Sequence, residues 1–259
     1  IESGVKINSR GLLATLPNIS AYVGGDIVAG VMASGMSNFS DLTLFIDLGT
    51  NGEVVLGNKE FLVCCSTSAG PCFEGGGIKN GVRAQAGAIE KLQIIPTHLD
   101  KLQIETIGNK KPVGICGAGI ISIVAELLKH KVIDKSGNFV VGSSERLIKT
   151  EEEEVEFFIA DSSSRDARQI SITQSDIKNL IHSKGAIFTG CEVLLKKMGF
   201  GFSDLSRIII AGGLGNALDI EKSIAIGLLP NLPKEKFLFI GNGSISGCTM
   251  CLLSQAAMK

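Results

Sequence analysis

Five short apolar runs, each leading directly into glycine or a small polar residue, constrain the fold of this chain more than any other feature. They read LTLFID, FLVCCS, PVGICG, RIIIAGG and FLFIGN. Such runs are typical of buried strands whose C-terminal ends open into loops. Helical patterns lie between them. We therefore predict an α/β chain with an open sheet, and ligands of such sheets bind at the carboxyl ends of the strands.

The clearest helical pattern runs from Ile172 to Gly199. Thr173 and Asp176 resemble a capping box at its start, since the side chain of each can bond the backbone N–H of the other. An earlier helix, from about Ile27 to Ala33, is rich in glycine and alanine. Small residues at that density predict close packing against another helix.

Composition excludes several classes of function. The 259 residues are 44% hydrophobic and 20% charged, which is enough apolar material for one large core or two lobes. The net charge of −1, with no Trp and one Tyr, makes nucleic acid an improbable partner. No apolar run reaches the length of a membrane span, so we predict no membrane association. Seven cysteines, an odd number, predict a reducing compartment and a cytoplasmic location.

Two weaker patterns are interpreted as structural. The pairs Cys64–Cys65 and Cys248–Cys251 lie in apolar stretches, where free cysteine behaves as a small core residue. The like-charge run from Lys149 to Glu156 is expected in a solvated loop or edge.

The stretch LTLFIDLGTNGEVVLGN permits two interpretations. An Asn-Gly pair between apolar runs is a strong hairpin signal. The same residues could bind phosphate, because Gly49 and Gly52 allow close backbone approach, Thr50 and Asn51 add donors, and Asp47 can hold Mg²⁺ through water. The residues alone leave both interpretations open.

Two further glycine loops are ambiguous when each is taken alone. The first contains Gly212, Gly213, Leu214 and Gly215, and could place backbone against a flat ring or ribose before a helix from residue 216, or be a plain strand-to-helix turn. The second places Asp26 at a helix N-terminus. That carboxylate could be a simple N-cap, or a general base or water-orienting group near a phosphate.

Two other segments also contain many glycines. The glycines of PVGICGAGIISIVAELL follow G-x-x-G-x-G spacing, and not the G-x-G-x-x-G of dinucleotide-binding folds. The long loop from Cys65 to Ala84 is too glycine-rich for a core element, and structureless loops of this length are usually functional. Its charged members Glu74 and Arg83 could face a nucleotide or water.

Six segments together resemble the C-terminal region of the reductive activators of corrinoid proteins. They are IDLGTNGEVVLGN, CSTSAGPCFEGGGIKNGVRAQAGAIE, KPVGICGAGIISIVAELL, ITQSDI, AGGLGNALDIEKSIAIGLLPNLP and GNGSISG, which occur in matching order between about Pro17 and Ser254. The family consists of ATP-dependent enzymes that return an oxidised corrinoid from Co(II) to Co(I) in methyltransferase systems. A corrinoid protein is then the expected partner.

The resemblance implies a fold and a set of site residues. The fold is a ribonuclease H-like lobe of the actin-like ATPase type, with a mixed sheet flanked by helices and ATP or ADP with Mg²⁺ in a cleft. Asp47 to Glu53 correspond to the second-lobe phosphate motif, with Asp47 as metal and catalytic residue. Residues 212–215 correspond to the adenosine motif, and Glu74 and Gly75 are expected to bind nucleotide. Asp26 takes the place of a catalytic or water-positioning carboxylate.

The resemblance also predicts how the chain is divided. Residues 1–40 are expected to end a first lobe and contain a connecting helix, and residues 41–259 to form the second lobe, with Ser244 to Ala256 as the second connecting helix. An earlier D-x-G-T motif and an N-terminal ferredoxin-like domain with a [2Fe-2S] cluster are expected only in a full-length protein. We therefore interpret the chain as a C-terminal fragment with weak or no activity alone.

Three functions remain open from the sequence. The first is the ATP-binding part of a corrinoid activator. The second is a small-molecule kinase of the same superfamily, and the third is a chaperone-like reactivating factor for corrinoid enzymes that exchanges cofactor and transfers no electron. Small-residue helices and the apolar content make a homodimer an additional expectation.

Overall fold

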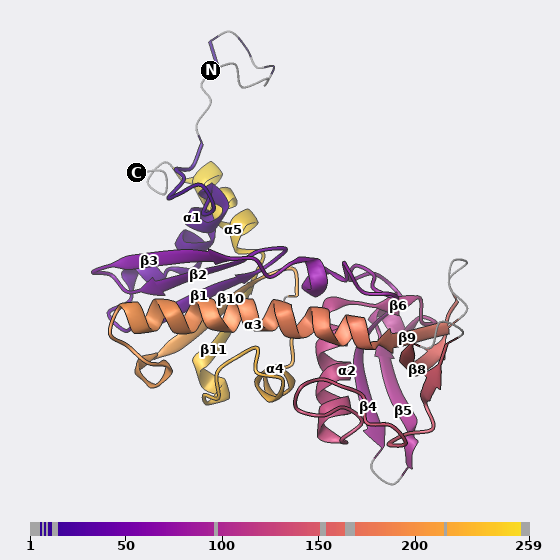
Figure 1. Cartoon of the computed structure of the whole chain (residues 1–259). Helices are drawn as coiled ribbons and strands as arrows, with labels where there is room; N and C mark the ends of the chain where they lie inside the picture. Colours follow the sequence, from indigo (N-terminus) through magenta and orange to yellow (C-terminus); the bar gives the residue numbers. More distant parts are fainter. Residues whose placement is uncertain are drawn as a thin grey trace.

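The computed structural model describes residues 6, 8, 10–11, 15–95, 98–150, 154–163, 169–214 and 217–254. Figure 1 shows a five-stranded sheet with helices α1 and α5 on one face and the long helix α3 along the other. Helix α3 continues beyond the sheet to a second group of elements, which contains α2, β4, β5, β8 and β9. A mixed sheet flanked by helices is the architecture predicted for this chain.

The five-stranded sheet has the order β11-β10-β1-β2-β3. Strand β1 pairs in parallel with β10 and antiparallel with β2, and β10 pairs in parallel with β11. All but β2 were expected from the apolar runs. The strands are β1 (Thr43–Leu48), β2 (Gly52–Gly57), β3 (Leu62–Thr67), β10 (Arg207–Gly212) and β11 (Phe237–Gly241).

The two faces of this sheet are both buried, because alternate residues point to opposite sides. Phe45, Val55 and Ile209 form one apolar cluster on the side of α1 (Gly25–Ser34). The neighbouring residues of the same strands point to the opposite face and belong to the main core, which extends without interruption into the second group of elements. Sheets buried on both faces require continuous apolar strands, which explains the runs seen in the sequence.

Helix α1 packs closely on α5 (Gly243–Leu253). A Cβ at Gly247 would lie 2.0 Å from the carbonyl oxygen of Ala29. Only glycine permits this approach, so the prediction of a small-residue helix packed against another helix is confirmed. Because these small residues are used within the chain, the expected homodimer depends on the apolar content alone and stays a prediction.

Helix α3 (Gln174–Lys197) begins with the expected capping box. The Asp176 N–H donates to the Thr173 hydroxyl at 3.0 Å, and the Thr173 N–H donates to the Asp176 carboxylate at 2.9 Å. The helix ends at Met198, and Gly199 follows with a positive φ of 79°. Reciprocal bonds of this kind satisfy two backbone donors that a helix start otherwise leaves without partners.

The second group of elements contains two three-stranded sheets, with orders β5-β4-β6 and β7-β8-β9. In these two sheets, the parallel pairing that the structure describes is the short one between β4 and β6. The G-x-x-G-x-G segment is therefore not part of a doubly wound parallel sheet of the kind that binds dinucleotides. The elements are β4 (Ala88–Ile95), β5 (His98–Thr106), β6 (Gly114–Ile115), α2 (Gly117–Lys129), β7 (Leu147–Lys149), β8 (Val155–Asp161), β9 (Gln169–Thr173) and α4 (Ile220–Ala225).

Helix α4 begins later than expected. It starts at Ile220 because the Asp219 side chain accepts the N–H of Lys222 at 3.0 Å and caps it. The expected start at Asn216 lies outside the described residues. Short 3-10 turns complete the chain at η1 (Met36–Asn38), η2 (Pro71–Glu74), η3 (Ile107–Asn109), η4 (Phe202–Asp204) and η6 (Lys234–Lys236).

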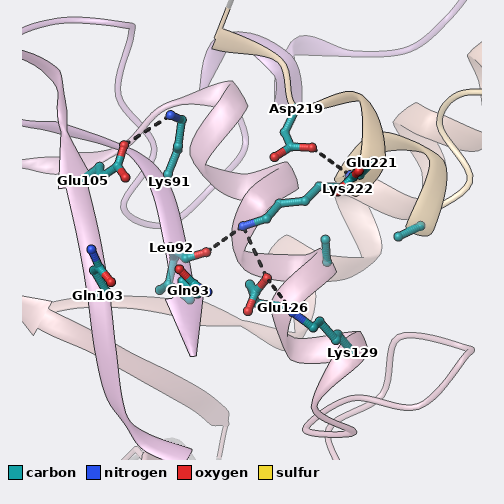
Figure 2. A pocket seen from close by; sticks show the side chains of 12 residues that line it. Lys91, Leu92, Gln93, Gln103, Glu105, Glu126, Lys129, Asp219, Glu221 and Lys222 are labelled. Carbon is teal, nitrogen blue, oxygen red and sulfur yellow. Dashed lines mark hydrogen bonds and ion pairs between the residues drawn. The ribbon is translucent and has the colours of Figure 1, made fainter. Parts of the chain in front are cut away.

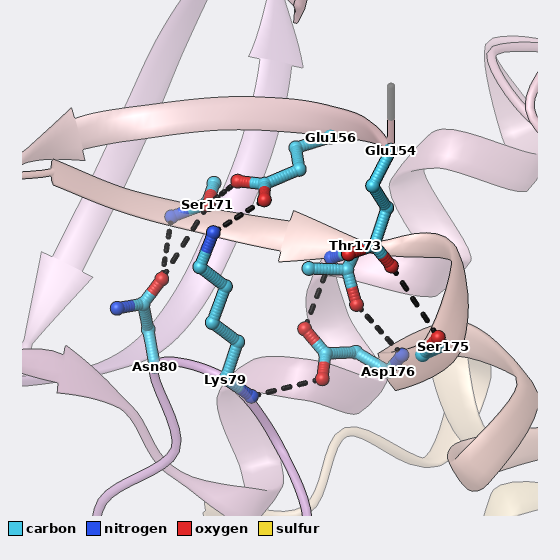
Figure 3. A network of polar contacts seen from close by, with 8 residues as sticks. All are labelled: Lys79, Asn80, Glu154, Glu156, Ser171, Thr173, Ser175 and Asp176. Carbon is cyan, nitrogen blue, oxygen red and sulfur yellow. Dashed lines mark hydrogen bonds and ion pairs between the residues drawn. The ribbon is translucent and has the colours of Figure 1, made fainter. Parts of the chain in front are cut away.

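The end of the acidic run differs from the expected solvated loop. Glu156 is 3% exposed and bonds both the Lys79 ammonium and the Ser171 hydroxyl (Figure 3). Next to it, the Ser171 N–H donates to Asn80 at 3.0 Å, and the Lys79 N–H donates to Asp176 at 2.9 Å. A buried carboxylate needs such partners. This network holds the long glycine-rich loop against β8, β9 and the start of α3.

The cysteines follow the predicted core interpretation only in part. Of the two pairs expected in the core, Cys64, Cys65 and Cys251 are half-buried and Cys248 on α5 is exposed. The other three cysteines, Cys72, Cys116 and Cys191, are buried. Helix α5 presents few buried residues, so an apolar sequence there does not guarantee burial. Among the helices that the structure describes, none has the length and apolar character needed to cross a bilayer.

Candidate functional site

The β1–β2 connection is a hairpin, as one of the two interpretations predicted. Asp47 pairs with Glu53 and Leu48 with Gly52 across it. The Gly49 N–H donates to the Asn51 carbonyl at 3.1 Å, which closes the turn. Gly52 is buried against α3, while Thr50 and Asn51 are exposed at the tip. The tip is therefore the part of this motif that a ligand could reach.

The loop after β10 lies directly beside this hairpin. Gly212 pairs with Leu48 in the parallel register, and a Cβ on Gly212 would lie 2.3 Å from the Leu48 carbonyl oxygen. Gly212 also has a φ of 111°, which side-chain-bearing residues rarely adopt. Gly213 is exposed and Leu214 buried, and Gly215 lies outside the described residues. Two glycine motifs far apart in sequence thus meet at the carboxyl ends of neighbouring strands.

A cavity of about 390 Å³ opens at these strand ends. Leu48 of β1, Gly213 after β10 and Asn242 after β11 line one side of it. The N-terminus of α2 and the long loop, through Glu74 and Arg83, line the rest. The position agrees with the general location of ligands in open α/β sheets.

The long loop touches the hairpin at one point. The Thr50 hydroxyl donates to both carboxylate oxygens of Glu74, at 3.0 and 3.1 Å. Glu74 is the last residue of η2 and is exposed. Because it bonds Thr50 and also lines the cavity, it lies between the hairpin tip and the cavity. Gly75 instead is buried against the backbone of Val82, where its role is packing.

Three carboxylates influence one another near the hairpin. Burial first, and then the charges of Glu53 and Asp26, raise the pKa of Asp47 from 3.8 to about 6. Burial also raises the pKa of Glu53, with a further contribution from Asp26, while a hydrogen bond from Ser66 at 3.1 Å acts in the opposite direction. Burial is thus the main cause of both raised pKa values, and repulsion between neighbouring carboxylates adds to it.

The structure excludes the plain N-cap role for Asp26. Gly24 is the N-cap of α1, without a side-chain cap bond, and Asp26 is the second helical residue. The Gly25 N–H donates to the side-chain oxygen of Asn18 at 3.1 Å. Asp26 is exposed and lies close enough to Asp47 and Glu53 to raise both of their pKa values. It is thus available to interact with a ligand at the hairpin.

These residues suit Mg²⁺ held mainly through water. No group of three or more His, Cys, Asp or Glu side chains in the described parts of the chain is arranged to hold a metal directly. Mg²⁺ commonly keeps several waters and uses one or two carboxylates together with ligand phosphates. Excess negative charge around Asp47 gives such a cation a favourable place beside the hairpin tip.

Sequence reasoning missed part of the cavity wall. Cys116, Gly117 and Ala118 line it from the start of α2, although these three residues were not predicted to bind a ligand. A Cβ at Gly117 would lie 1.8 Å from the carbonyl oxygen of Phe73, so glycine lets the long loop cross the helix start. The available signal was that PVGICG was itself predicted to be a strand that opens into a loop. Its short strand β6 belongs to a different sheet from β1 and β10, so it is the fold as a whole that brings this loop to the cavity.

A larger cavity, of about 480 Å³, lies elsewhere, between β4, β5, α2 and α4. Figure 2 shows ion pairs among its charged side chains, in which Lys91 lies beside Glu105, and both Lys129 and Lys222 lie beside Glu126. The Lys222 ammonium donates to the Leu92 carbonyl and the Ser122 hydroxyl, both at 2.8 Å, and lies 3.4 Å from Glu126. Its three protons are thus all directed at protein partners. This cluster fastens α4 to α2 and β4, and the smaller cavity remains the better ligand site.

The mixed sheet, the hairpin and the adjoining glycine loop define an actin-like ATPase (ASKHA) domain. Residues 41–259 match the family described as the C-terminal domain of RACo, the ASKHA domain, and residues 1–39 match the RACo middle region. The chain belongs to this family. The predicted fold and resemblance are thereby confirmed.

Three similar proteins carry related descriptions. The corrinoid activation enzyme RamQ of Eubacterium limosum is 34% identical over 98% of this chain and 44% of its own length. A [Co(II) methylated amine-specific corrinoid protein] reductase of Methanosarcina barkeri is 25% identical over 94% of this chain and 45% of its own. A solved structure of a reductive activator for corrinoid, iron-sulfur protein is 44% identical, with a TM-score of 0.91, over 99% of this chain and 41% of that one. The chain therefore spans less than half the length of each.

Proposed function

We propose that this chain is the ATP-binding part of an activator that reduces a Co(II) corrinoid to Co(I) on a corrinoid protein of a methyltransferase system. The observation that carries the proposal is that the end of β1, from which the hairpin projects, and the loop after β10 line one cavity. Family membership and the names of the similar proteins support the reductive role.

The residues have distinct roles in this proposal. The tip formed by Gly49, Thr50 and Asn51 receives phosphates of ATP or ADP, and the loop that starts at Gly212 receives the adenosine. Asp47 holds Mg²⁺ through water. When bound, the cation neutralises phosphate charge. Calorimetric titration of the chain with ATP and Mg²⁺ tests this directly, and the absence of binding would refute it.

Asp26 is proposed as the catalytic or water-positioning carboxylate. Its exposure at the start of α1 and its interaction with Asp47 support this role. Asp26→Ala should leave nucleotide binding nearly intact while lowering ATP hydrolysis in the longer protein. Equal hydrolysis by the variant and the unmodified protein would contradict it.

The reduction itself needs more than this domain. Co(I) is strongly reducing, so an electron donor needs an energy input to populate it, and a change in the fit to the corrinoid protein on ATP binding or hydrolysis would supply this. We propose that a [2Fe-2S] domain elsewhere in the longer protein delivers the electron. Formation of Co(I), measured by its absorption with and without ATP, tests the coupling.

The two other functions give different results. A small-molecule kinase would transfer phosphate to an acid or sugar, and calorimetry with ATP and candidate substrates would detect it. A chaperone-like factor would exchange corrinoid without electron transfer, so its longer form would lack iron–sulfur absorption.

Light scattering tests the predicted homodimer.

A further inference from the structure

Glu74 holds a position that the nucleotide-binding proposal leaves unexplained. Its carboxylate accepts the Thr50 hydroxyl proton with both oxygens, at 3.0 and 3.1 Å. Thr50 is at the hairpin tip, where phosphates are expected. Glu74 also lines the cavity in which the nucleoside is expected. One carboxylate thus lies at the junction between the two halves of the site.

The electrostatics of this junction oppose a bare nucleotide. Asp47, Glu53 and Asp26 already place negative charge beside the hairpin. Glu74 adds another carboxylate and engages the hydroxyl that would otherwise donate to a phosphate oxygen. Arg83, on the same long loop, is the one cation among the described residues that line the cavity. A polyphosphate without a counterion would therefore meet like charges at short range.

We propose that Glu74 makes nucleotide binding conditional on a divalent cation. Without the cation, the Glu74 carboxylate engages the Thr50 hydroxyl at the hairpin tip, and its negative charge repels phosphate. A cation bound to the phosphates removes the repulsion, so that the Thr50 hydroxyl can turn from the carboxylate to a phosphate oxygen. This inference rests on the proposed function, because it assigns a specificity to the same site.

The test compares nucleotide affinity with Mg²⁺ and with a chelator, using ATP and the full chain in calorimetric titration. In the unmodified chain, removing Mg²⁺ should weaken binding strongly. In Glu74→Gln, ATP should bind about tenfold more tightly in the chelator than it does to the unmodified chain, as loss of one nearby like charge predicts. Glu60→Gln, which removes an exposed carboxylate at the other end of the hairpin, should behave as the unmodified chain.

A second variant separates charge from hydrogen bonding. Thr50→Val removes the donor but keeps the Glu74 carboxylate, so the dependence on Mg²⁺ should persist while affinity in Mg²⁺ falls. The proposal is overturned if Glu74→Gln keeps the full dependence on Mg²⁺, or if Glu60→Gln loses it equally. Failure of the unmodified chain to bind ATP at any Mg²⁺ concentration would instead refute the proposed function, and this inference with it.

Discussion

Asp47→Asn should stabilise the folded chain near neutral pH. The pKa of Asp47 rises from 3.8 to about 6 on folding, so its ionised form is disfavoured in the native state. Each pKa unit corresponds to 1.36 kcal/mol, which makes the penalty about 3 kcal/mol. Because an amide still loses hydration on burial, we expect the variant to gain about 2 kcal/mol at pH 7.

The size of this stabilisation depends on pH. Below pH 3.8 the carboxyl group is protonated in both states and the penalty vanishes, while above about pH 6 it is ionised in both and the penalty is complete. The stability gained by Asp47→Asn should therefore grow as pH rises through this window. Urea denaturation from pH 4 to pH 8, at constant ionic strength, measures it.

Two controls make the measurement decisive. Asp161→Asn removes an exposed carboxylate at the end of β8, and should change stability by less than about 0.5 kcal/mol at every pH. Saturating Mg²⁺ should raise the stability of the unmodified chain by mass action, and raise that of Asp47→Asn less. A destabilised Asp47→Asn at pH 7, or a gain that does not vary with pH, would refute the reasoning.

Three further changes test the packing around the site by thermal or urea denaturation. Thr173→Ala removes the α3 cap and should destabilise by about 1 kcal/mol, whereas no change would mean that water replaces the bond. Lys222→Met removes one of the ion-pair partners of the buried Glu126 and should destabilise by about 2 kcal/mol; a loss below about 0.5 kcal/mol would contradict the network. Gly117→Ala would drive a methyl group into the Phe73 carbonyl and should destabilise by about 2–3 kcal/mol, with weaker ATP binding; unchanged stability would show that the loop can move aside.

The main sheet could be predicted because its strands are buried on both faces. Such strands are continuous apolar runs, and a run that ends in Asp47 or Gly212 also marks where the sheet opens. The helix start at Thr173 was predictable because a cap depends on residues three positions apart. These features are local in the sequence, so local reasoning was sufficient for them.

The rest of the site depends on contacts that no local pattern encodes. The bond between Thr50 and Glu74 joins two loops whose meeting is set by the whole fold. Burial of Glu156 likewise results from Lys79 and Ser171, which come from distant segments. Sequence reasoning therefore identified glycine motifs individually, but could not derive which side chains face one another across the cavity.

The close contact of Gly247 with Ala29 has a consequence for the order of folding. The two helices that it joins, α1 and α5, come from opposite ends of the sequence. During synthesis α1 emerges before strands β1 to β11, and its partner α5 becomes available only after them. Contacts of such long range form late and slowly. A growing chain must therefore leave one side of α1 uncovered until α5 has been synthesised.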